Sequence, residues 1–231
     1  MPNYITNHIS MEGSDSDIEA VINFLRNDEE DVAVDFNNVI PMPESLNMTS
    51  GSIEDQAIAV YMYRVRKNDN KIVRIFNYPW VEKAGISTLD ELCEKFENDN
   101  PDIVALGEKY VNNIEQHGHS TWYGWCCDNW GTKWNALDAW SSGNTIGFET
   151  AWSGVPDIME KISEKFPNIK FTYRWADEDF GCNLGELVLK GGKIIDTNIP
   201  SPCSDEAYEM AADILGYDPR DEWDEEEEEE E

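Results

Sequence analysis

The chain has 231 residues, a length that suits one large domain or one domain with an insertion. It is 40% hydrophobic and 11% aromatic, which excludes a disordered protein, and its longest apolar runs are too short to predict a transmembrane helix. The net charge of −31 disfavours direct binding to DNA or RNA phosphates. The N-terminus lacks the basic and apolar regions of a signal peptide, so we expect a cytoplasmic protein.

The N-terminal part, residues 1–51, has the pattern of the first half of a sheet domain. The alternating segment Tyr4–Met11 predicts a strand, and Ser14 or Ser16 can cap the helix that follows. Val32–Phe36 predicts a second strand. Together these elements indicate a compact strand–helix–strand unit.

The next part, residues 52–117, is predicted to be a helical insertion of three or four helices. Its helix-start signals are Ser52 with Asp55, Thr88 with Glu91 in a capping box, and Pro101. After the insertion, Ser120 or Thr121 is expected to cap a short helix that carries tryptophans on one side.

Residues 118–200 supply the second half of the sheet domain. Thr145–Trp152 and Ile169–Trp175 read as strands around a helix that starts near Pro156, and Gly191-Gly192 predicts a hairpin turn. A C-terminal helix is expected within 201–219, and the acidic tail 220–231 is expected to be disordered because its like charges repel. Two successive strand–helix–strand units predict an α+β fold: a ferredoxin-like antiparallel sheet with helices on one face and an inserted helical subdomain.

Tryptophan is concentrated in one region, with seven of the nine residues between positions 122 and 175. Each large ring needs a packed environment, so we expect the cluster to form core. The stem of Lys133 can pack on indole while its ammonium group pairs with an acid or lies over a ring. The residues assigned a structural role are Trp122, Trp125, Trp130, Lys133, Trp134 and Trp152.

The five cysteines are expected to be buried free thiols, because their number is odd and their spacing irregular. A zinc site is the less favoured alternative, since its ligands would have the wrong spacing. Those ligands would be His117, His119, Cys126 and Cys127. No cofactor is predicted.

One cluster of carboxylates and one isolated glutamate are candidates for chemical roles. Asp177, Glu178 and Asp179 follow a strand, and we favour a solvated turn over a metal or acid–base site. Glu149 is expected to form an ion pair with Lys133 or Arg174.

Signals for catalysis are weak elsewhere, so we predict that the protein is not an enzyme. No serine or cysteine has a nucleophile motif, and Gly191-Gly192-Lys193 lacks the spacing of a phosphate loop. An aromatic groove that stacks nucleic-acid bases is a further alternative, which the negative charge opposes.

One run of residues is distinctive, Asn129-Trp130-Gly131-Thr132-Lys133-Trp134-Asn135-Ala136. Weaker motifs are Met1-Pro2-Asn3, Asp35-Phe36-Asn37, Ile40–Glu44, Phe148–Trp152 and Glu178–Gly181. Together these segments resemble the YubB-type ferredoxin-like domain family of phages, prophages and conjugative plasmids. The resemblance implies the fold and a mobile-element setting, and it transfers no catalytic residues.

From charge and setting together we predict a mobile-element accessory protein that binds another protein. In this hypothesis it is an acidic nucleic-acid mimic that inhibits a host nucleic-acid-handling defence complex, such as a CRISPR effector. The candidate partner-binding residues are Asp177, Glu178, Asp179, Asp221, Glu222 and Asp224. The alternatives are a regulatory module whose acidity serves solubility and a metal-dependent enzyme that uses the cluster at 177–179.

Overall fold

The computed structural model describes residues 3–29 and 31–219, and the chain divides into two compact units. The first, here called the sheet unit, comprises residues 1–41 and 126–231. The second, the helical unit, comprises residues 42–125 and contains the expected insertion 52–117. The segment 220–231, which is expected to be a disordered acidic tail, lies outside the described residues.

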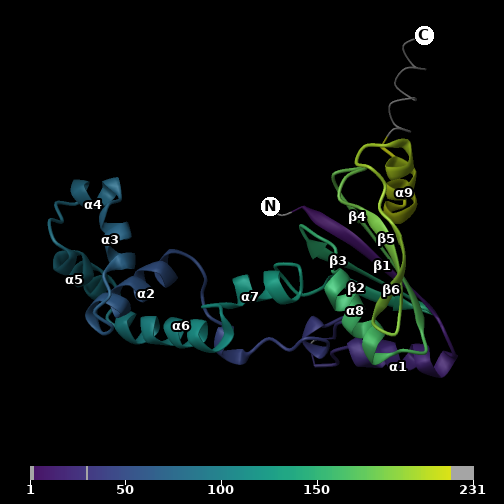
Figure 1. Ribbon diagram of the computed structural model, residues 1–231, viewed down its shortest axis with the longest axis horizontal. Helices are drawn as coiled ribbons and strands as arrows, with labels where there is room; N and C mark the ends of the chain where they lie inside the picture. Colours follow the sequence, from purple (N-terminus) through teal and green to yellow (C-terminus); the bar gives the residue numbers. More distant parts are fainter. Residues whose placement is uncertain (1–2, 30, 220–231) are drawn as a thin grey trace, which may run out of the picture. The chain divides into compact units, whose positions relative to one another are not determined.

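A six-stranded antiparallel sheet with the order β2-β3-β1-β4-β5-β6 forms the centre of the sheet unit (Figure 1). Its strands are β1 (Tyr4–Glu12), β2 (Leu137–Ser142), β3 (Thr145–Ala151), β4 (Lys170–Asp177), β5 (Gly185–Lys190) and β6 (Lys193–Asn198). β3 lies between β1 and β2 and is antiparallel to both, so β1 and β2 are parallel to each other. This split arrangement is the ferredoxin-like topology that the sequence predicts, extended by β5 and β6.

The predicted second strand, Val32–Phe36, is wrong. Val32 forms only an isolated bridge with Asn27, and Phe36–Asn38 is the short 3-10 helix η1. Asp35 causes the difference, because its carboxylate accepts the Asn37 backbone N–H and caps η1. The strand that completes the first strand–helix–strand unit is β2, which follows the helical unit in the chain.

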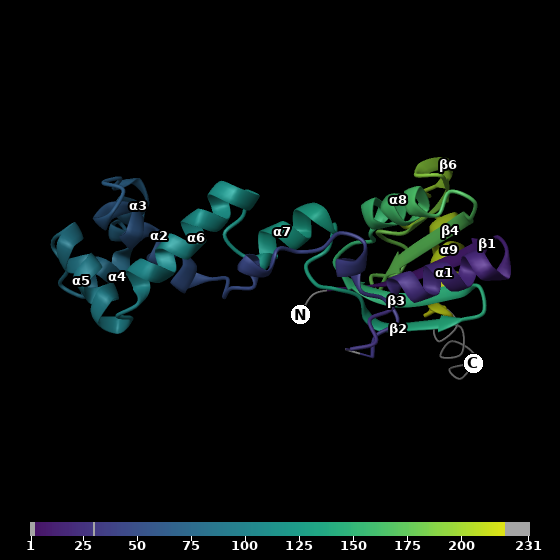
Figure 2. The same ribbon diagram turned by 90° about the horizontal axis from the view of Figure 1, so that it is seen from below.

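One face of the sheet is covered by α1 (Asp15–Leu25) and α8 (Pro156–Lys165), as Figure 2 shows. Alternate strand residues point into this core because successive side chains in a strand face opposite sides. Those on the three central strands are Ile5, Asn7, Ile9, Met11, Ile146, Phe148, Thr150, Phe171, Tyr173 and Trp175.

A polar network crosses this core. The Asn7 carboxamide donates to Thr150 Oγ1 at 2.9 Å and accepts from Tyr173 Oη at 2.7 Å. The same hydroxyl accepts the Val155 N–H at 2.7 Å, next to the start of α8. All four groups are therefore satisfied, as buried polar groups require. Burial raises the pKa of Tyr173 well above its usual value, so the phenol stays neutral.

The opposite face of the sheet carries the C-terminal helix α9 (Asp205–Leu215). Its buried residues Ala207, Met210, Ala211 and Ile214 pack with Ala176 of β4 and with Leu184. In the register of the sheet, Ala176 points away from the face that Tyr173 and Trp175 share. The two helices of the ferredoxin-like core, α1 and α8, thus lie on one face of the sheet, as predicted. The additional helix α9 covers part of the opposite face.

The helical unit has its own core. Its elements are η2 (Glu44–Leu46), α2 (Ser52–Arg64), α3 (Asn70–Phe76), α4 (Pro79–Lys83), α5 (Leu89–Asp99) and α6 (Ile103–His117), and α7 (Trp122–Asn129) follows. The predicted capping box is confirmed at α5, where Thr88 and Glu91 exchange hydrogen bonds. At α2 the cap differs from the predicted pair Ser52 and Asp55. Gly51 is the capping residue, and its backbone N–H donates to the Glu54 carboxylate at 3.3 Å.

Helices α2 and α6 make the closest contact in this unit. A Cβ on Gly107 of α6 would lie 2.1 Å from the Ala57 carbonyl oxygen of α2 and 2.6 Å from Tyr61 Cβ. Only glycine fits there, since no real Cβ approaches a backbone atom so closely. The buried residues around this contact are Ile58, Val60, Ile72, Leu92, Phe96, Ile103 and Tyr110.

Candidate functional site

The predicted carboxylate cluster at residues 177–179 has two different roles. Asp177 is only 5% exposed and its carboxylate accepts three hydrogen bonds. The donors are Asn3 Nδ2 at 3.2 Å, the Asp179 N–H at 2.9 Å and Asn183 Nδ2 at 2.9 Å. Asp177 therefore organises the turn, whereas Glu178 and Asp179 are exposed. Glu178 and Asp179 fit the expected solvated turn, but Asp177 does not, because it is buried, and its place among the candidate partner-binding residues is corrected accordingly.

This turn lies against α9. The rings of Phe180 and Tyr208 stack with centroids 5.8 Å apart and planes 12° apart. α9 has acidic residues on its outer side and no lysine or arginine. We define the acidic surface as the exposed residues of the turn and the helix: Glu178, Asp179, Asp205, Glu206, Glu209 and Asp213.

One cation lies beneath this surface. Arg174 Nη1 contacts Asp213 Oδ2 at 2.6 Å, and Arg174 Nε lies 3.2 Å from Glu186 Oε2 without hydrogen-bond geometry. The neighbouring strand residue is His8, whose pKa is lowered by burial and then by the charge of Arg174. His8 is therefore neutral at pH 7, and Arg174 is shared between two carboxylates.

The expected ion pair of Glu149 with Lys133 or Arg174 is wrong. Arg174 is engaged by Asp213 and Glu186, and the Lys133 ammonium lies 3.8 Å from the Trp134 ring centroid and 4.8 Å from that of Trp152. Among the described residues, Glu149 has no cationic partner within ion-pair distance. Its pKa is raised by burial and then by the charges of Asp138 and Glu178. This part of the sheet is thus a region of uncompensated negative charge.

The charge is distributed unequally between the two units. The described part of the sheet unit has 24 Asp and Glu but only eight Lys and Arg, and the helical unit has 13 and eight. Six of the sheet unit's eight cations are already held by a carboxylate or an aromatic ring. They are Arg26, Lys133, Lys161, Lys165, Lys170 and Arg174. The acidic excess is therefore a property of the sheet unit.

The tryptophan cluster is only partly core. Trp125 and Trp130 are buried, and the Trp130 indole donates to the Ile40 carbonyl at 2.9 Å. Trp122 and Trp134 are half-buried, whereas Trp152 is 43% exposed and holds the Lys133 ammonium. The expectation of a fully buried cluster is corrected, because an ammonium beside an indole must keep access to water.

The cysteines also differ from the expectation. Cys93 and Cys126 are buried, and burial raises the pKa of the Cys93 thiol to about 11 and that of Cys126 to about 12. Cys203 is exposed, and its sulfur lies 3.5 Å from that of the half-buried Cys182. Within residues 3–29 and 31–219, no three His, Cys, Asp or Glu side chains are grouped to hold a metal ion.

Three predicted partner-binding residues, Asp221, Glu222 and Asp224, lie outside the described residues. No helix in the described part of the chain is both long and apolar enough to cross a bilayer.

The helical unit has a pocket around α3 and the start of α4 that the sequence patterns did not predict. The signal was present as Lys71 and Arg74, one helical turn apart, followed by Tyr78-Pro79-Trp80. It was not recognised because the residues lie in a segment without strong periodicity.

Comparison with known proteins agrees with the strand order. Residues 129–230 match the family model described as "Ferredoxin-like domain in Api92-like protein". The match supports the ferredoxin-like fold class of the sheet unit, to which β1 and α1 also belong. Among solved structures, the crystal structure of a protein api92 from Yersinia pseudotuberculosis is similar at 9% identity and a TM-score of 0.39. That similarity covers 87% of this chain and 99% of the other. No curated protein matches the chain.

Proposed function

We propose that the protein is a non-enzymatic accessory factor that works by binding another protein through the acidic surface. Its target would be a nucleic-acid-handling complex of the host, whose basic channel the acidic surface occupies in place of DNA or RNA. The observation that carries this proposal is the set of exposed carboxylates on the turn and on α9, a helix that has no lysine or arginine of its own, because a basic partner would compensate their charge.

The arrangement of α9 supports the proposal. Asp205, Glu209 and Asp213 follow one another at intervals of four residues, so they form a row along one side of the helix. Each step rises about 6 Å along the helix axis. Asp205 lies in the first turn, where an acid stabilises the helix, and Asp213 pairs with Arg174, whereas Glu209 has neither of these roles and its charge is directed to solvent.

The rigidity of α9 also favours a role in recognition. Its inner side is buried on the sheet and its first turn is capped by Ser204, which accepts the Ala207 N–H at 3.2 Å. Carboxylates on a fixed helix lose little conformational entropy on binding, and long-range attraction increases the rate of encounter with a basic partner.

The setting of this activity rests on the resemblance to the YubB-type family. It suggests a phage or plasmid protein that acts in the host cytoplasm, with host defence complexes, CRISPR effectors among them, as candidate targets. The charge distribution is independent of that suggestion and supports protein binding in any setting.

The test is a pull-down from host lysate with the full chain as bait, at low and high salt, followed by competition with DNA and RNA. We expect a nucleic-acid-binding protein that is released by high salt and by the competing nucleic acid, because both screen or replace the acidic contacts. Recovery of a partner that resists both treatments would contradict the mimic and leave a plain interaction module.

The metal-dependent alternative predicts that residues 177–179 bind magnesium or manganese. Asp177 is buried and already accepts three hydrogen bonds that a metal ion would have to compete with, which disfavours this use of its carboxylate. Calorimetric titration with both metals distinguishes the two functions, since the protein-binding proposal expects no binding at this turn.

A further inference from the structure

The helical unit contains a pocket of about 260 Å³ at the outer side of α2 and α3. This volume lies near the lower end of the roughly 300–1,000 Å³ that small-molecule sites span, so it suits a single small ligand. The lining of the pocket includes cations on one side and exposed aromatic rings on another. Every lining residue belongs to the helical unit, so the pocket is complete within it.

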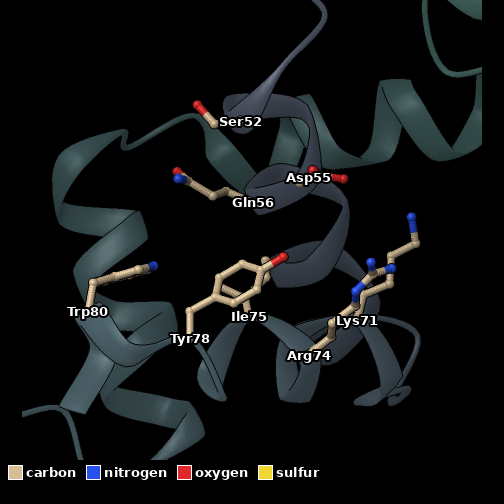
Figure 3. Close-up of a pocket in the computed structure, with 8 residues that line it drawn as sticks. All are labelled: Ser52, Asp55, Gln56, Lys71, Arg74, Ile75, Tyr78 and Trp80. Atoms are coloured by element: carbon tan, nitrogen blue, oxygen red, sulfur yellow. The ribbon is translucent and has the colours of Figure 1, made fainter.

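Lys71 and Arg74 form the cationic side of the pocket. They are three residues apart on α3 and therefore project from the same side of the helix, as Figure 3 shows. Both side chains are exposed, and neither has a carboxylate within ion-pair distance among the described residues. Some other cations of this unit are paired with carboxylates, for example Arg64 with Asp90 and Glu97. Two neighbouring cations without a partner constitute an anion-binding side.

The aromatic side is formed by Tyr78 and Trp80, which are 47% and 38% exposed. Pro79 at the first turn of α4 fixes the backbone between them. In Figure 3 Trp80 stands on the side of the pocket away from Lys71, with its ring nitrogen directed inward, and the Tyr78 ring lies between Trp80 and Arg74. Exposed rings beside cations are the combination that binds a planar base together with its phosphate.

The remaining polar groups belong to α2. Gln56 and Asp55 line the pocket between the aromatic and cationic sides. A carboxamide can donate to and accept from the edge of a base, and a carboxylate can accept from ribose hydroxyls. Asp55 opposes a bare anion, so its presence favours a ligand that also carries hydroxyl groups.

We propose that this pocket binds a nucleoside phosphate, with the phosphate at Lys71 and Arg74 and the base at Tyr78 and Trp80. This inference goes beyond protein binding by the acidic surface and uses a different unit of the chain. The ligand is a free mononucleotide, because the net charge of −31 repels a long polyanion more strongly than a small ligand.

The test is calorimetric titration of the full chain with AMP, GMP, CMP and UMP, and with adenosine and inorganic phosphate as part-ligands. We expect at least one mononucleotide to bind and both part-ligands to bind at least tenfold more weakly, because each engages only one side. A lack of binding by all four mononucleotides at millimolar concentration would overturn the proposal, as would inorganic phosphate binding as tightly as the best of them.

Variants locate the binding. The double variant Lys71→Gln with Arg74→Gln should weaken mononucleotide binding at least tenfold, and Trp80→Leu should weaken it without changing the affinity for inorganic phosphate. Lys83→Gln with Lys109→Gln is the matched control, because both are exposed cations of the same unit that do not line the pocket. Melting temperatures check that each variant is folded. Equal losses of mononucleotide affinity in the two double variants would indicate a general electrostatic effect and would contradict binding at this pocket.

Titration with a 5′-phosphorylated tetranucleotide tests whether the ligand is a free nucleotide or a nucleotide at the end of a strand. Weaker binding of the tetranucleotide supports the free ligand. Tighter binding that Lys71→Gln with Arg74→Gln abolishes supports recognition of a nucleoside phosphate at a strand end and overturns the choice of a free mononucleotide.

Discussion

Asn135 Nδ2 donates to Asp35 Oδ1 over 2.7 Å, although 100 residues of chain separate them. The same carboxamide accepts the Phe36 N–H at 2.8 Å, so one side chain fixes both sides of the point where the chain leaves and re-enters the sheet unit. The two sequence motifs that carry the family resemblance, around Asp35 and around Asn135, are therefore one structural feature.

Replacing Asn135 should destabilise the sheet unit. Asn135→Ala leaves the Phe36 N–H without its acceptor, and an unsatisfied buried donor costs about 1–3 kcal/mol. Chemical denaturation measures the loss, and Asn168→Ala, at an exposed position, is the control. Equal stabilities of the two variants would show that this junction is not fixed by Asn135.

The stability should also depend on pH through Asp35. Burial by itself would raise the pKa of its carboxyl, but hydrogen bonds from Asn135, Asn27 and Asn37 outweigh burial and lower it. A lowered folded-state pKa gives stability that is complete above the unfolded value of about 3.9 and is lost as the pH falls through the folded value.

Asp35→Asn should therefore be less stable than the parent at pH 7, and this difference should shrink below about pH 4. Denaturation at a series of pH values measures the effect, with Glu19→Gln on the exposed side of α1 as the control. A difference that stays constant with pH would contradict the assigned role of the carboxylate.

The tryptophans should differ sharply in their contributions. Trp130 is 3% exposed, packs on Phe36 with centroids 5.8 Å apart and donates to Ile40. Trp130→Ala should cost about 3–5 kcal/mol because it leaves a cavity. Trp152→Ala should lower the melting temperature much less, since this ring is 43% exposed. A similar loss in both variants would refute the division of the cluster into core and surface.

Gly107 should be essential to the helical unit. Gly107→Ala places a methyl group against the Ala57 carbonyl, and overpacking of this kind costs about 1–3 kcal/mol or more. Hydrogen exchange should show faster exchange in α2 and α6, with the sheet unit unaffected because it has a separate core. Glu108→Ala, exposed on the same helix, is the control, and unchanged exchange in Gly107→Ala would contradict the close contact.

Local signals in the sequence predict most single elements, because caps and periodicity act over a few residues. Thr88 with Glu91 and the helix that follows Ser204 are confirmed for this reason. The alternating apolar residues of Val32–Phe36 are typical of a strand, although this segment does not form one. The sequence of β2 lacks a strand pattern because it contains serines and the exposed Trp140. The pairing of β2 with β3 completes a unit that begins at Tyr4, on the far side of the helical unit in the chain, which no local pattern can reveal.

The candidate sites were harder to predict because they depend on which face each residue occupies. The sequence places Asp177, Glu178 and Asp179 together, but only the folded turn distinguishes the buried, hydrogen-bonded carboxylate of Asp177 from the two exposed ones. Likewise, the partner of Lys133 depends on Trp152, which the fold brings to the same ring cluster as Trp134.

The central claim is that the acidic surface, and not the overall charge, binds the partner. The most direct measurement compares the partner affinity of two variants with equal net charge. The first removes four acids of the acidic surface: Glu178→Gln, Asp179→Asn, Glu206→Gln and Glu209→Gln. The second removes four exposed acids of the helical unit: Glu44→Gln, Glu82→Gln, Glu94→Gln and Glu108→Gln.

We predict that the first variant binds the captured partner at least tenfold more weakly than the parent and that the second binds within about twofold of it, because contacts made at the interface outweigh long-range charge at physiological salt. Equal weakening of both variants, or unchanged binding by the first, would contradict the claim.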